Sequence, residues 1–545
     1  MMLSRPLGFA AGGLAVLVML PLAAVVMLAL GGGGGDAWAH LAATGLAGYV
    51  WNSIALMLLV GVGVIALGVG SAWLTALCEF PGRIWLQAAL VLPLALPGYV
   101  IAYAYTDFLQ FSGPVQTGVR ALAGMDGVAW KAAGFWFPEV RSLPGAAAMF
   151  VLVLYPYVYL PVRVAFAASG ANLTEAARTL GHAPRSAFFR IALPLARPAI
   201  AGGVALALME TLADFGAVSY FGVDTFTAGI YKAWFGLGDK GVAARLACLL
   251  MLFTLSLLWL ERAGRGRARY ASASLRQGAV AFRFDGWRGA AAFAAAALPA
   301  VLGFLAPVLI LARLAWREID GVAWDRFARQ AANSTQVGLA TAAVAVCAAL
   351  IVAYSARGDR RLAWLSRMTS LGYAVPGAVI AVGILVPLAG FDNWLDALVR
   401  EHFGVRTGLL VTGSIAGLVF ACVVRFLAVA QGNVEAGLAR VTTSMDDASR
   451  AMGLTAMQTL LRVHAPLLVK SLMIAALLVF VDSIKELPAT LVLRPFNFDT
   501  LATHAYTLAK DERLGEAAWP CLAIVLVSLG PVVLLSRALG GRHRT

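Results

Sequence analysis

The chain has 545 residues, of which 61% are hydrophobic and 13% are charged, and its formal net charge is +14. A soluble globular protein is about 45–50% apolar and about 25% charged, so this composition excludes an ordinary soluble enzyme and equally a disordered chain. It is typical of an α-helical protein that crosses the membrane many times and is large enough for two helical bundles.

A membrane span needs about 20 mostly apolar residues. The segments that meet this requirement are, in chain order, roughly 7–30, 53–77, 86–106, 145–167, 194–216, 243–261, 289–312, 335–355, 369–390, 407–430, 466–490 and 519–538. The apolar run of the first segment is too long for a signal peptide, and no small-residue cleavage site follows it. We therefore expect twelve retained spans.

The positive charge is distributed unevenly between the two sides of the membrane. Lys and Arg are in large excess in the connections on the side of the N-terminus, whereas the opposite connections are close to neutral. The positive-inside rule then predicts that both termini are cytoplasmic. The basic charge reflects topology and contact with the lipid bilayer, as for Arg262, Arg265, Arg267 and Arg269 beside a span, so no nucleic-acid partner is expected.

The sequence contains an internal repeat. Three motifs occur once in each half: an Asn-Ser pair that opens a span, a Pro-Gly pair inside a span, and an amphipathic connection that ends in proline. They are Asn52-Ser53 and Asn333-Ser334, Pro97-Gly98 and Pro376-Gly377, and the connections Glu175–Pro194 and Asp447–Pro466. An even number of spans separates the two connections, which predicts parallel six-span repeats, 1–288 and 289–545, with both connections in the cytoplasm.

Each amphipathic connection predicts a short helix, a glycine turn, a second short helix and a proline that opens the next span. Gly181 and Gly453 permit the sharp turn, and Pro194 and Pro466 suit a first helical turn. Such a segment either is a plain connector or presents a helix to a cytoplasmic partner. The same spacing in both copies favours the partner helix.

The run Glu175-Ala176-Ala177, with Gly181 and then Leu193-Pro194, resembles the signature of permeases of binding-protein-dependent ABC importers. In that family the loop is the coupling helix that docks on an ATPase subunit. The resemblance implies a type I importer permease fold built from two fused permease domains, with coupling loops 172–194 and 444–466. The coupling residues it implies are Glu175, Ala176, Ala177, Gly181, Asp447, Ala448 and Gly453. The second copy departs from the signature, because Asp447 and Ser449 replace Glu and Ala.

The resemblance also implies the partners: two cytoplasmic ABC ATPase subunits and a periplasmic substrate-binding protein, at a bacterial inner membrane. The sequence contains no Gly-Lys dipeptide, and a Walker A loop needs that lysine at the phosphates. We therefore expect ATP and Mg²⁺ on the partner ATPase. On this chain we expect no catalytic residue, no cofactor and no resident metal site, so that it is a transport subunit and not an enzyme.

Three segments, Tyr155–Pro161, Met209–Gly236 and Asp482–Thr490, resemble the ferric-iron branch of the family. This resemblance implies import of Fe(III) delivered by the binding protein. Two alternatives remain open. One is the same architecture with thiamine, a polyamine or a phosphonate as cargo, and the other is a twelve-span secondary transporter that needs no ATPase.

Four acidic residues lie in the predicted spans. Glu210 and Asp214, like Asp482 and Glu486, are four residues apart, which on a continuous helix places both carboxylates on one face. Ionisable side chains inside spans are costly and usually face a cavity or a partner. We expect these acids to line the translocation pathway toward its periplasmic end. The alternatives are that they cap broken helices or pair with Lys485.

Tyr157, in the run Tyr155-Pro-Tyr157-Val-Tyr159, is a further pathway candidate. Phenolate oxygens are hard ligands suited to Fe(III), although tyrosine is also enriched at membrane interfaces for its amphipathic ring. The six histidines show no metal-ligand spacing. His182 and His464 lie in the coupling loops, where we expect partner contacts.

Overall fold

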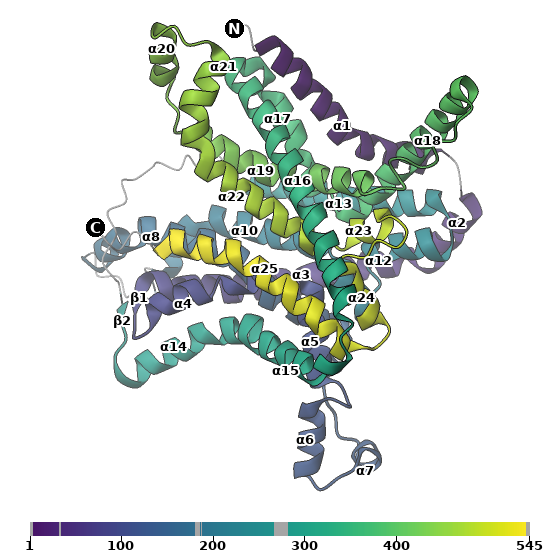
Figure 1. The fold of residues 1–545 in the computed structure, drawn as a ribbon. Coiled ribbons are helices and arrows are strands. Elements are labelled where there is room, and N and C mark those ends of the chain that lie inside the picture. The colour runs from purple at the N-terminus through teal and green to yellow at the C-terminus, as the bar shows by residue number, and fades with distance from the viewer. Residues whose placement is uncertain (1–3, 32–33, 180–185, 187, 266–281, 541–545) are drawn as a thin grey trace. The chain divides into compact units, whose positions relative to one another are not determined.

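The computed structural model consists almost entirely of helices (Figure 1) and describes residues 4–31, 34–179, 186, 188–265 and 282–540. Within this part of the chain, eleven helices are long and apolar enough to cross a membrane, or twelve if one bent pair counts as a single span. The prediction of an all-α polytopic membrane protein is confirmed.

The chain divides into two compact units that do not follow the sequence halves. Unit 1 holds residues 1–44, 229–252 and 323–504, and unit 2 holds residues 45–228, 253–322 and 505–545. Each unit thus combines the central helices of one half with terminal segments of the other half. Because these units reflect packing and not chain order, the boundary between the repeats at residue 288 stays a prediction.

Unit 1 is built on α16, α19 and α22, which pack against one another, while α1 lies against α16, α17 and α18. Ala11 and Ala15 of α1 share a buried cluster with Val352 and Leu365. The helices of this unit are α1 (Ser4–Leu30), α2 (Gly35–Thr44), α16 (Trp324–Gly358), α17 (Ala363–Thr369), α18 (Gly377–Phe403), α19 (Ile415–Leu438), α20 (Thr443–Ala451), α21 (Ala456–Thr459), α22 (Ala465–Lys485) and α23 (Pro488–Leu493). Two 3-10 turns, η6 (Arg360–Leu362) and η7 (Ser370–Ala374), and two π-helical turns, η3 (Lys232–Gly236) and η8 (Leu460–His464), complete it.

Unit 2 is built on α3, α8 and α10, with α14, α15 and α25 packed around α4 and α5. Its elements are α3 (Leu46–Leu77), β1 (Cys78–Glu79), α4 (Arg83–Ala89), η1 (Leu92–Ala95), α5 (Gly98–Leu109), α6 (Pro114–Leu122), α7 (Gly127–Ala132), α8 (Leu143–Thr179), η2 (Phe188–Ala192), α10 (Leu193–Ala213), α11 (Gly216–Tyr220), β2 (Phe282–Arg283), α14 (Gly286–Ala300), η4 (Val301–Leu305), α15 (Ala306–Arg317), η5 (Ile319–Gly321) and α25 (Leu514–Gly540). The strands β1 and β2 pair in parallel. Three helices cross between the units: α12 (Phe226–Tyr231), α13 (Lys240–Arg265) and α24 (Leu501–Lys510).

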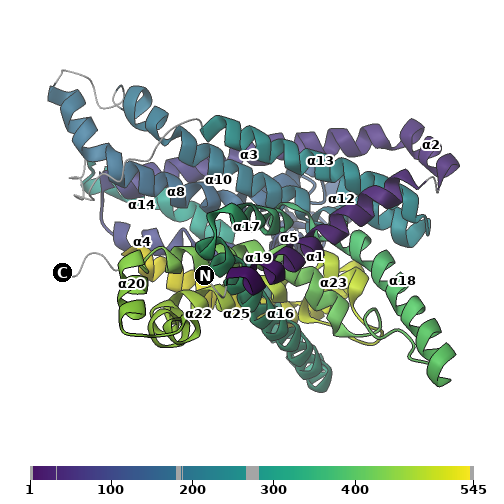
Figure 2. The same cartoon turned by 90° about the horizontal axis from the view of Figure 1, so that it is seen from above.

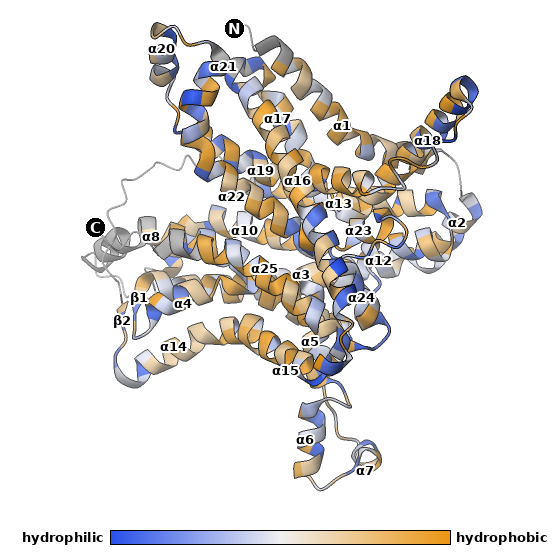
Figure 3. Cartoon of the chain, viewed as in Figure 1, coloured by the Kyte–Doolittle hydropathy of each residue, from blue (hydrophilic) through white to orange (hydrophobic). Residues whose placement is uncertain are grey.

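Apolar surface follows the long helices. Figure 3 shows hydrophobic residues along α1, α16, α22 and α25, whereas α20 and the far end of α18 are hydrophilic. Large apolar side chains such as Met27 of α1 and Val62 of α3 stay exposed in the protein alone. An exposed apolar surface of this kind is suited to lipid contact.

The third and ninth predicted spans, 86–106 and 369–390, are not continuous helices. Leu96 and Val375, each just before a proline, have extended backbones with ψ of 121° and 122°. A residue before proline avoids the helical region for steric reasons, so α5 and α18 begin only after the breaks. In unit 2 the segments before and after the break are bent by 95°.

Three further predicted boundaries are wrong. The spans expected at 194–216 and 466–490 end at Ala213 and Lys485, and the span expected from residue 407 begins at Ile415. At this last boundary the hydroxyl of Ser414 accepts a hydrogen bond from the N–H of Ala416 and caps the helix.

Candidate translocation and coupling sites

Asp214 and Glu486 occupy equivalent positions directly after α10 and α22. Both have extended backbones, with ψ of 137° and 113°. Asp214 Oδ1 accepts a hydrogen bond from the N–H of Ala217 at 2.8 Å, and Glu486 Oε1 accepts one from the N–H of Ala489 at 3.0 Å. Each carboxylate therefore caps the short helix that follows, α11 or α23.

The expectation that each acid pair shares one helix face is wrong, because the helix ends before the second acid. Glu210 and Asp482 lie in the last turns of α10 and α22, and both are half-buried. Asp482 forms an ion pair with Lys485 at 3.1 Å. Capping and pairing thus account for three of the four acids, and the pathway role of the set stays a prediction.

Arg425 of α19 is an intramembrane charge that the sequence reasoning missed. Its guanidinium forms an ion pair with the carboxylate of Glu486, and the two side chains are only 11% and 3% exposed. The signal was present in the sequence, because a single arginine inside an apolar span requires a partner. The residue 272 positions earlier is Val153, so the first repeat carries no equivalent arginine.

The two Pro-Gly motifs meet the capping acids. A Cβ added at Gly98 would lie 3.3 Å from Asp214 Oδ2, and one added at Gly377 would lie 2.5 Å from both Glu486 Oε1 and Arg425 Nη1. The start of α5 in unit 2 and the start of α18 in unit 1 thus approach the equivalent carboxylate in the same way. A side chain at Gly377 would overlap the ion pair, whereas one at Gly98 would be a tight fit.

In each unit an Asn-Ser pair is hydrogen-bonded to an equivalent connection, which joins α11 to α12 in the first repeat and α23 to α24 in the second. In unit 2, Asn52 Nδ2 donates to the carbonyl of Asp224 at 3.1 Å, and Ser53 Oγ accepts from the N–H of Phe226 at 3.4 Å. In unit 1 the same contacts join Asn333 to Asp499 at 2.9 Å and Ser334 to Leu501 at 2.8 Å. A repeated Asp-Thr dipeptide, at 224–225 and 499–500, is the signal that marks this connection in the sequence.

The second coupling loop has the predicted form. α20 is followed by Gly453 with a φ of +78°, a conformation that glycine adopts without strain, and then by α21 and the start of α22. Asp447 and Ala448 are exposed on α20, and the side chain of Asp447, 69% exposed, pairs with Arg450 on the surface. His464 is buried and contacts Tyr354, so the expectation that it faces a partner is wrong for this conformation.

The first coupling loop differs from the second in its described residues. Glu175, Ala176 and Ala177 lie in the last turns of α8, which continues from the membrane to Thr179. The separate short helix expected here is therefore an extension of the span. Gly181 and His182 lie outside the described residues. Tyr157 lies midway along the same helix and is half-buried.

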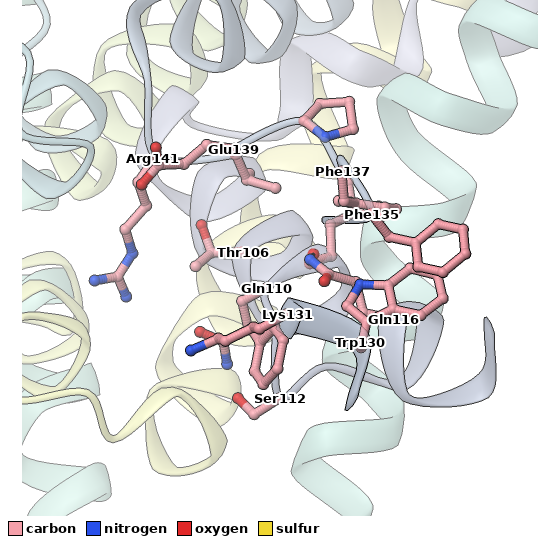
Figure 4. Close-up of a pocket in the computed structure, with 14 residues that line it drawn as sticks. Thr106, Gln110, Ser112, Gln116, Trp130, Lys131, Phe135, Phe137, Glu139 and Arg141 are labelled. Atoms are coloured by element: carbon pink, nitrogen blue, oxygen red, sulfur yellow. The ribbon is translucent and has the colours of Figure 1, made fainter. Parts of the chain in front are cut away.

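A pocket of about 560 Å³ is lined by the end of α5, by α6 and α7, and by the segment 135–141 that leads into α8. Figure 4 shows Phe135, Trp130 and Gln116 on one side of it and Arg141 on the other. The rings of Trp130 and Phe135 stack with centroids 4.4 Å apart. This pocket is at the N-terminal end of α8, whereas the coupling residues are at its C-terminal end.

Two parts of the chain match one known protein family. The profile described as "Binding-protein-dependent transport system inner membrane component" matches residues 65–270 and 345–542. The chain belongs to this family. Each match contains one coupling loop, so this inner membrane component carries the family's domain twice. The match confirms the family resemblance seen in the sequence.

Relatives of this inner membrane component have different names. The Fe(3+)-transport system permease protein FbpB 2 of Haemophilus influenzae is 24% identical over 500 residues, which are 89% of each chain. The molybdenum transport system permease protein ModB of Escherichia coli is 34% identical over 211 residues, 37% of this chain and 87% of its own. A putative 2-aminoethylphosphonate transport system permease protein, PhnU of Salmonella choleraesuis, is 26% identical over 47% of this chain and 89% of its own.

Proposed function

We propose that this permease of a binding-protein-dependent importer carries Fe(III) from a periplasmic binding protein into the cytoplasm. The main support is the similarity to the Fe(3+)-transport permease, because it extends over 89% of both chains and thus over both repeats. The acids at the ends of α10 and α22 add chemical support, since carboxylate oxygens attract a hard cation.

Two ATPase subunits supply the energy in this proposal and bind at the two coupling loops. The exposed face of α20, with Asp447 and Ala448, is the surface offered to one of them. ATP-driven closure of the subunits changes the relative stability of inward- and outward-facing states, which is the thermodynamic meaning of coupling. ATP and Mg²⁺ belong to those subunits.

In this proposal the N-terminus is cytoplasmic, because the second coupling loop must face the ATPase. In unit 1 the first part of α1 packs near the end of α16, at Val352, and Arg357 at that same end contacts α20. Figure 2 also places the N-terminus near α20. A cytoplasmic ATPase therefore requires a cytoplasmic N-terminus. The α6–α7 insertion, at the other end of α8, then faces the binding protein.

An oxyanion is the second candidate cargo. The similarity to the molybdenum permease favours an oxyanion. Its identity of 34% is higher than the 24% of the Fe(3+)-transport permease, although it extends over only 37% of this chain. The two candidates differ in charge, so they predict opposite effects of removing acids from the pathway. A cation loses attraction when Glu210 and Asp482 are neutralised, whereas an anion gains from it.

Uptake by cells with and without the chain tests the cargo. Radiolabelled ferric iron, molybdate and thiamine are supplied in parallel, and we expect loss of ferric uptake alone. The double variant Glu210→Gln, Asp482→Asn is then expected to lower ferric uptake, while Glu401→Gln, at an exposed position near the end of α18, leaves it unchanged. Loss of molybdate or thiamine uptake alone would overturn the iron assignment and leave the importer architecture.

A further inference from the structure

The second coupling helix is joined to the membrane helices through one carboxylate. Asp446, in the first turn of α20, accepts a hydrogen bond at Oδ2 from Arg357 Nη2 at 2.6 Å. Its other oxygen, Oδ1, lies 2.8 Å from His464 Nε2. The arginine contact is a charge-assisted hydrogen bond, which is among the stronger and more directional contacts in proteins. The histidine contact has the distance of an ion pair but not the geometry of a hydrogen bond.

The three side chains come from three different elements. Arg357 closes α16, and it also donates to the carbonyl of Val441, just before α20. His464 directly precedes α22, and its Nδ1 is hydrogen-bonded to the hydroxyl of Tyr354 at 2.9 Å. The network therefore ties α20 to both α16 and α22, which are two of the three central helices of unit 1.

The network faces inward and leaves the outer face of α20 free. The side chain of His464 is 5% exposed and that of Asp446 is 23% exposed, whereas the neighbouring Asp447 points outward. Two adjacent acids on one short helix thus have opposite surroundings. The inner acid holds the helix, and the outer acid is available to a partner.

The first repeat has a different joint. The positions equivalent to Asp446 and His464, 272 residues earlier, are Thr174 and Ala192. Near the end of α3 the ring of Trp73 instead contacts Phe188 of η2 and Phe282 of β2, with centroids 6.0 and 5.9 Å apart. These aromatic contacts are apolar and are less strict in direction than a hydrogen-bonded carboxylate.

We propose that Arg357, Asp446 and His464 form a polar joint that transmits movement of the second coupling helix to α16 and α22. The proposal rests on the ATP-driven function proposed above. Because one carboxylate oxygen is hydrogen-bonded to Arg357 of α16 and the other lies against His464 beside α22, a tilt or slide of α20 disturbs both contacts. These are positioning residues, and they make the two coupling loops unequal in how they pass on the motion of the ATPase.

The first test compares coupling in the complete complex, reconstituted in vesicles with the ATPase subunits and Fe(III)-loaded binding protein. Asp446→Asn keeps the shape and removes the charge. We expect the ATPase subunits to remain bound, while transport per ATP hydrolysed falls about tenfold, within the usual range of coupling energies. Asp359→Asn, an exposed acid two residues beyond Arg357, is the matched control and retains the wild-type ratio.

A conservative pair at His464 separates transmission from simple packing. Glutamine keeps polar atoms that can face Asp446 and Tyr354, whereas leucine fills the space without any polar atom. We expect His464→Gln to retain most of the coupling and His464→Leu to lose it. Equal coupling in both variants, or loss of ATPase binding by Asp446→Asn, would overturn the proposal.

The second test needs no cargo and no binding protein. Spin labels replace the exposed Met452, just after α20, and Met473 of α22 in a cysteine-free chain bound to the ATPase subunits. In the labelled chain with Asp446 intact, we expect a narrow distribution of the distance between the two labels, both before and after ATP is added. In the labelled chain with Asp446→Asn, we expect this distribution to broaden when ATP is added. A narrow distribution in both chains would overturn the proposal of a polar joint. Failure of ferric uptake with these distances as expected would instead count against the cargo alone.

Discussion

Arg425 and Glu486 form an ion pair that is almost completely removed from solvent, between α19 and the residue that ends α22. The same carboxylate caps α23. One side chain thus fixes three elements of unit 1: the helix before it, the helix after it and α19.

Removing one partner of this pair is expected to be far more costly than replacing both. Arg425→Leu leaves a buried carboxylate without its counter-charge, at a cost of about 3–5 kcal/mol. The double variant Arg425→Leu, Glu486→Gln keeps an oxygen for the cap and is expected to recover much of the lost stability. Thermal unfolding of the purified chain in detergent measures both. A double variant as unstable as Arg425→Leu would contradict the interpretation.

The same alanine substitution in the two Pro-Gly motifs is expected to have unequal effects. At Gly377 a Cβ would lie 2.5 Å from Arg425 Nη1, whereas at Gly98 the nearest atom, Phe150 Cε1, would be 3.0 Å away. Gly377→Ala must displace the ion pair, so we expect a cost of about 1–3 kcal/mol, typical of overpacking. Gly98→Ala is the matched control with a smaller loss. Equal melting temperatures for the two variants would count against this difference.

The serine contacts of the Asn-Ser pairs also differ between the units. Ser334 Oγ accepts from the N–H of Leu501 at 2.8 Å, and Ser53 Oγ accepts from that of Phe226 at 3.4 Å. Loss of a good hydrogen bond leaves a buried N–H unsatisfied, at a cost of about 1–3 kcal/mol. Ser334→Ala should therefore speed amide hydrogen exchange around Leu501 more than Ser53→Ala does around Phe226. Unchanged exchange in both variants would contradict this.

The ion pair between Arg141 and Glu512 predicts a pH dependence outside the spans. Arg141 donates to both carboxylate oxygens, at 2.6 and 2.7 Å. These hydrogen bonds lower the pKa of Glu512 below its usual value of 4.5. A lowered carboxyl pKa stabilises the fold above the unfolded pKa, and this stabilisation disappears as the pH falls through the folded pKa. The side chain of Glu512 is 58% exposed, so the effect is screened and small.

Glu512→Gln tests this dependence. At neutral pH the parent chain should melt at a slightly higher temperature than the variant, and the difference should shrink as the pH falls through the lowered pKa of Glu512. Differential scanning measurements in detergent across this range would record it. A difference that is constant with pH would mean that the carboxylate charge contributes nothing.

The sequence alone determined the class of protein and its internal repeat. Hydrophobic length is a local property, so runs such as 53–77 predicted α3 without knowledge of its neighbours. The glycine turn at Gly453 was equally predictable, because a short polar segment between helices needs a residue that accepts a positive φ. The relatives confirm the family for the same reason, since motifs are read along the chain.

Only the tertiary structure decided what the charges do. Asp482 and Glu486 are equally acidic in sequence, yet one pairs locally with Lys485 and the other with Arg425, 61 residues away. The adjacent acids Asp446 and Asp447 have the same side chain. Successive residues of a helix point in different directions, so the first lies against His464 and the second lies at the surface. Desolvation and pairing depend on neighbours from other helices, and the order of residues does not specify those neighbours.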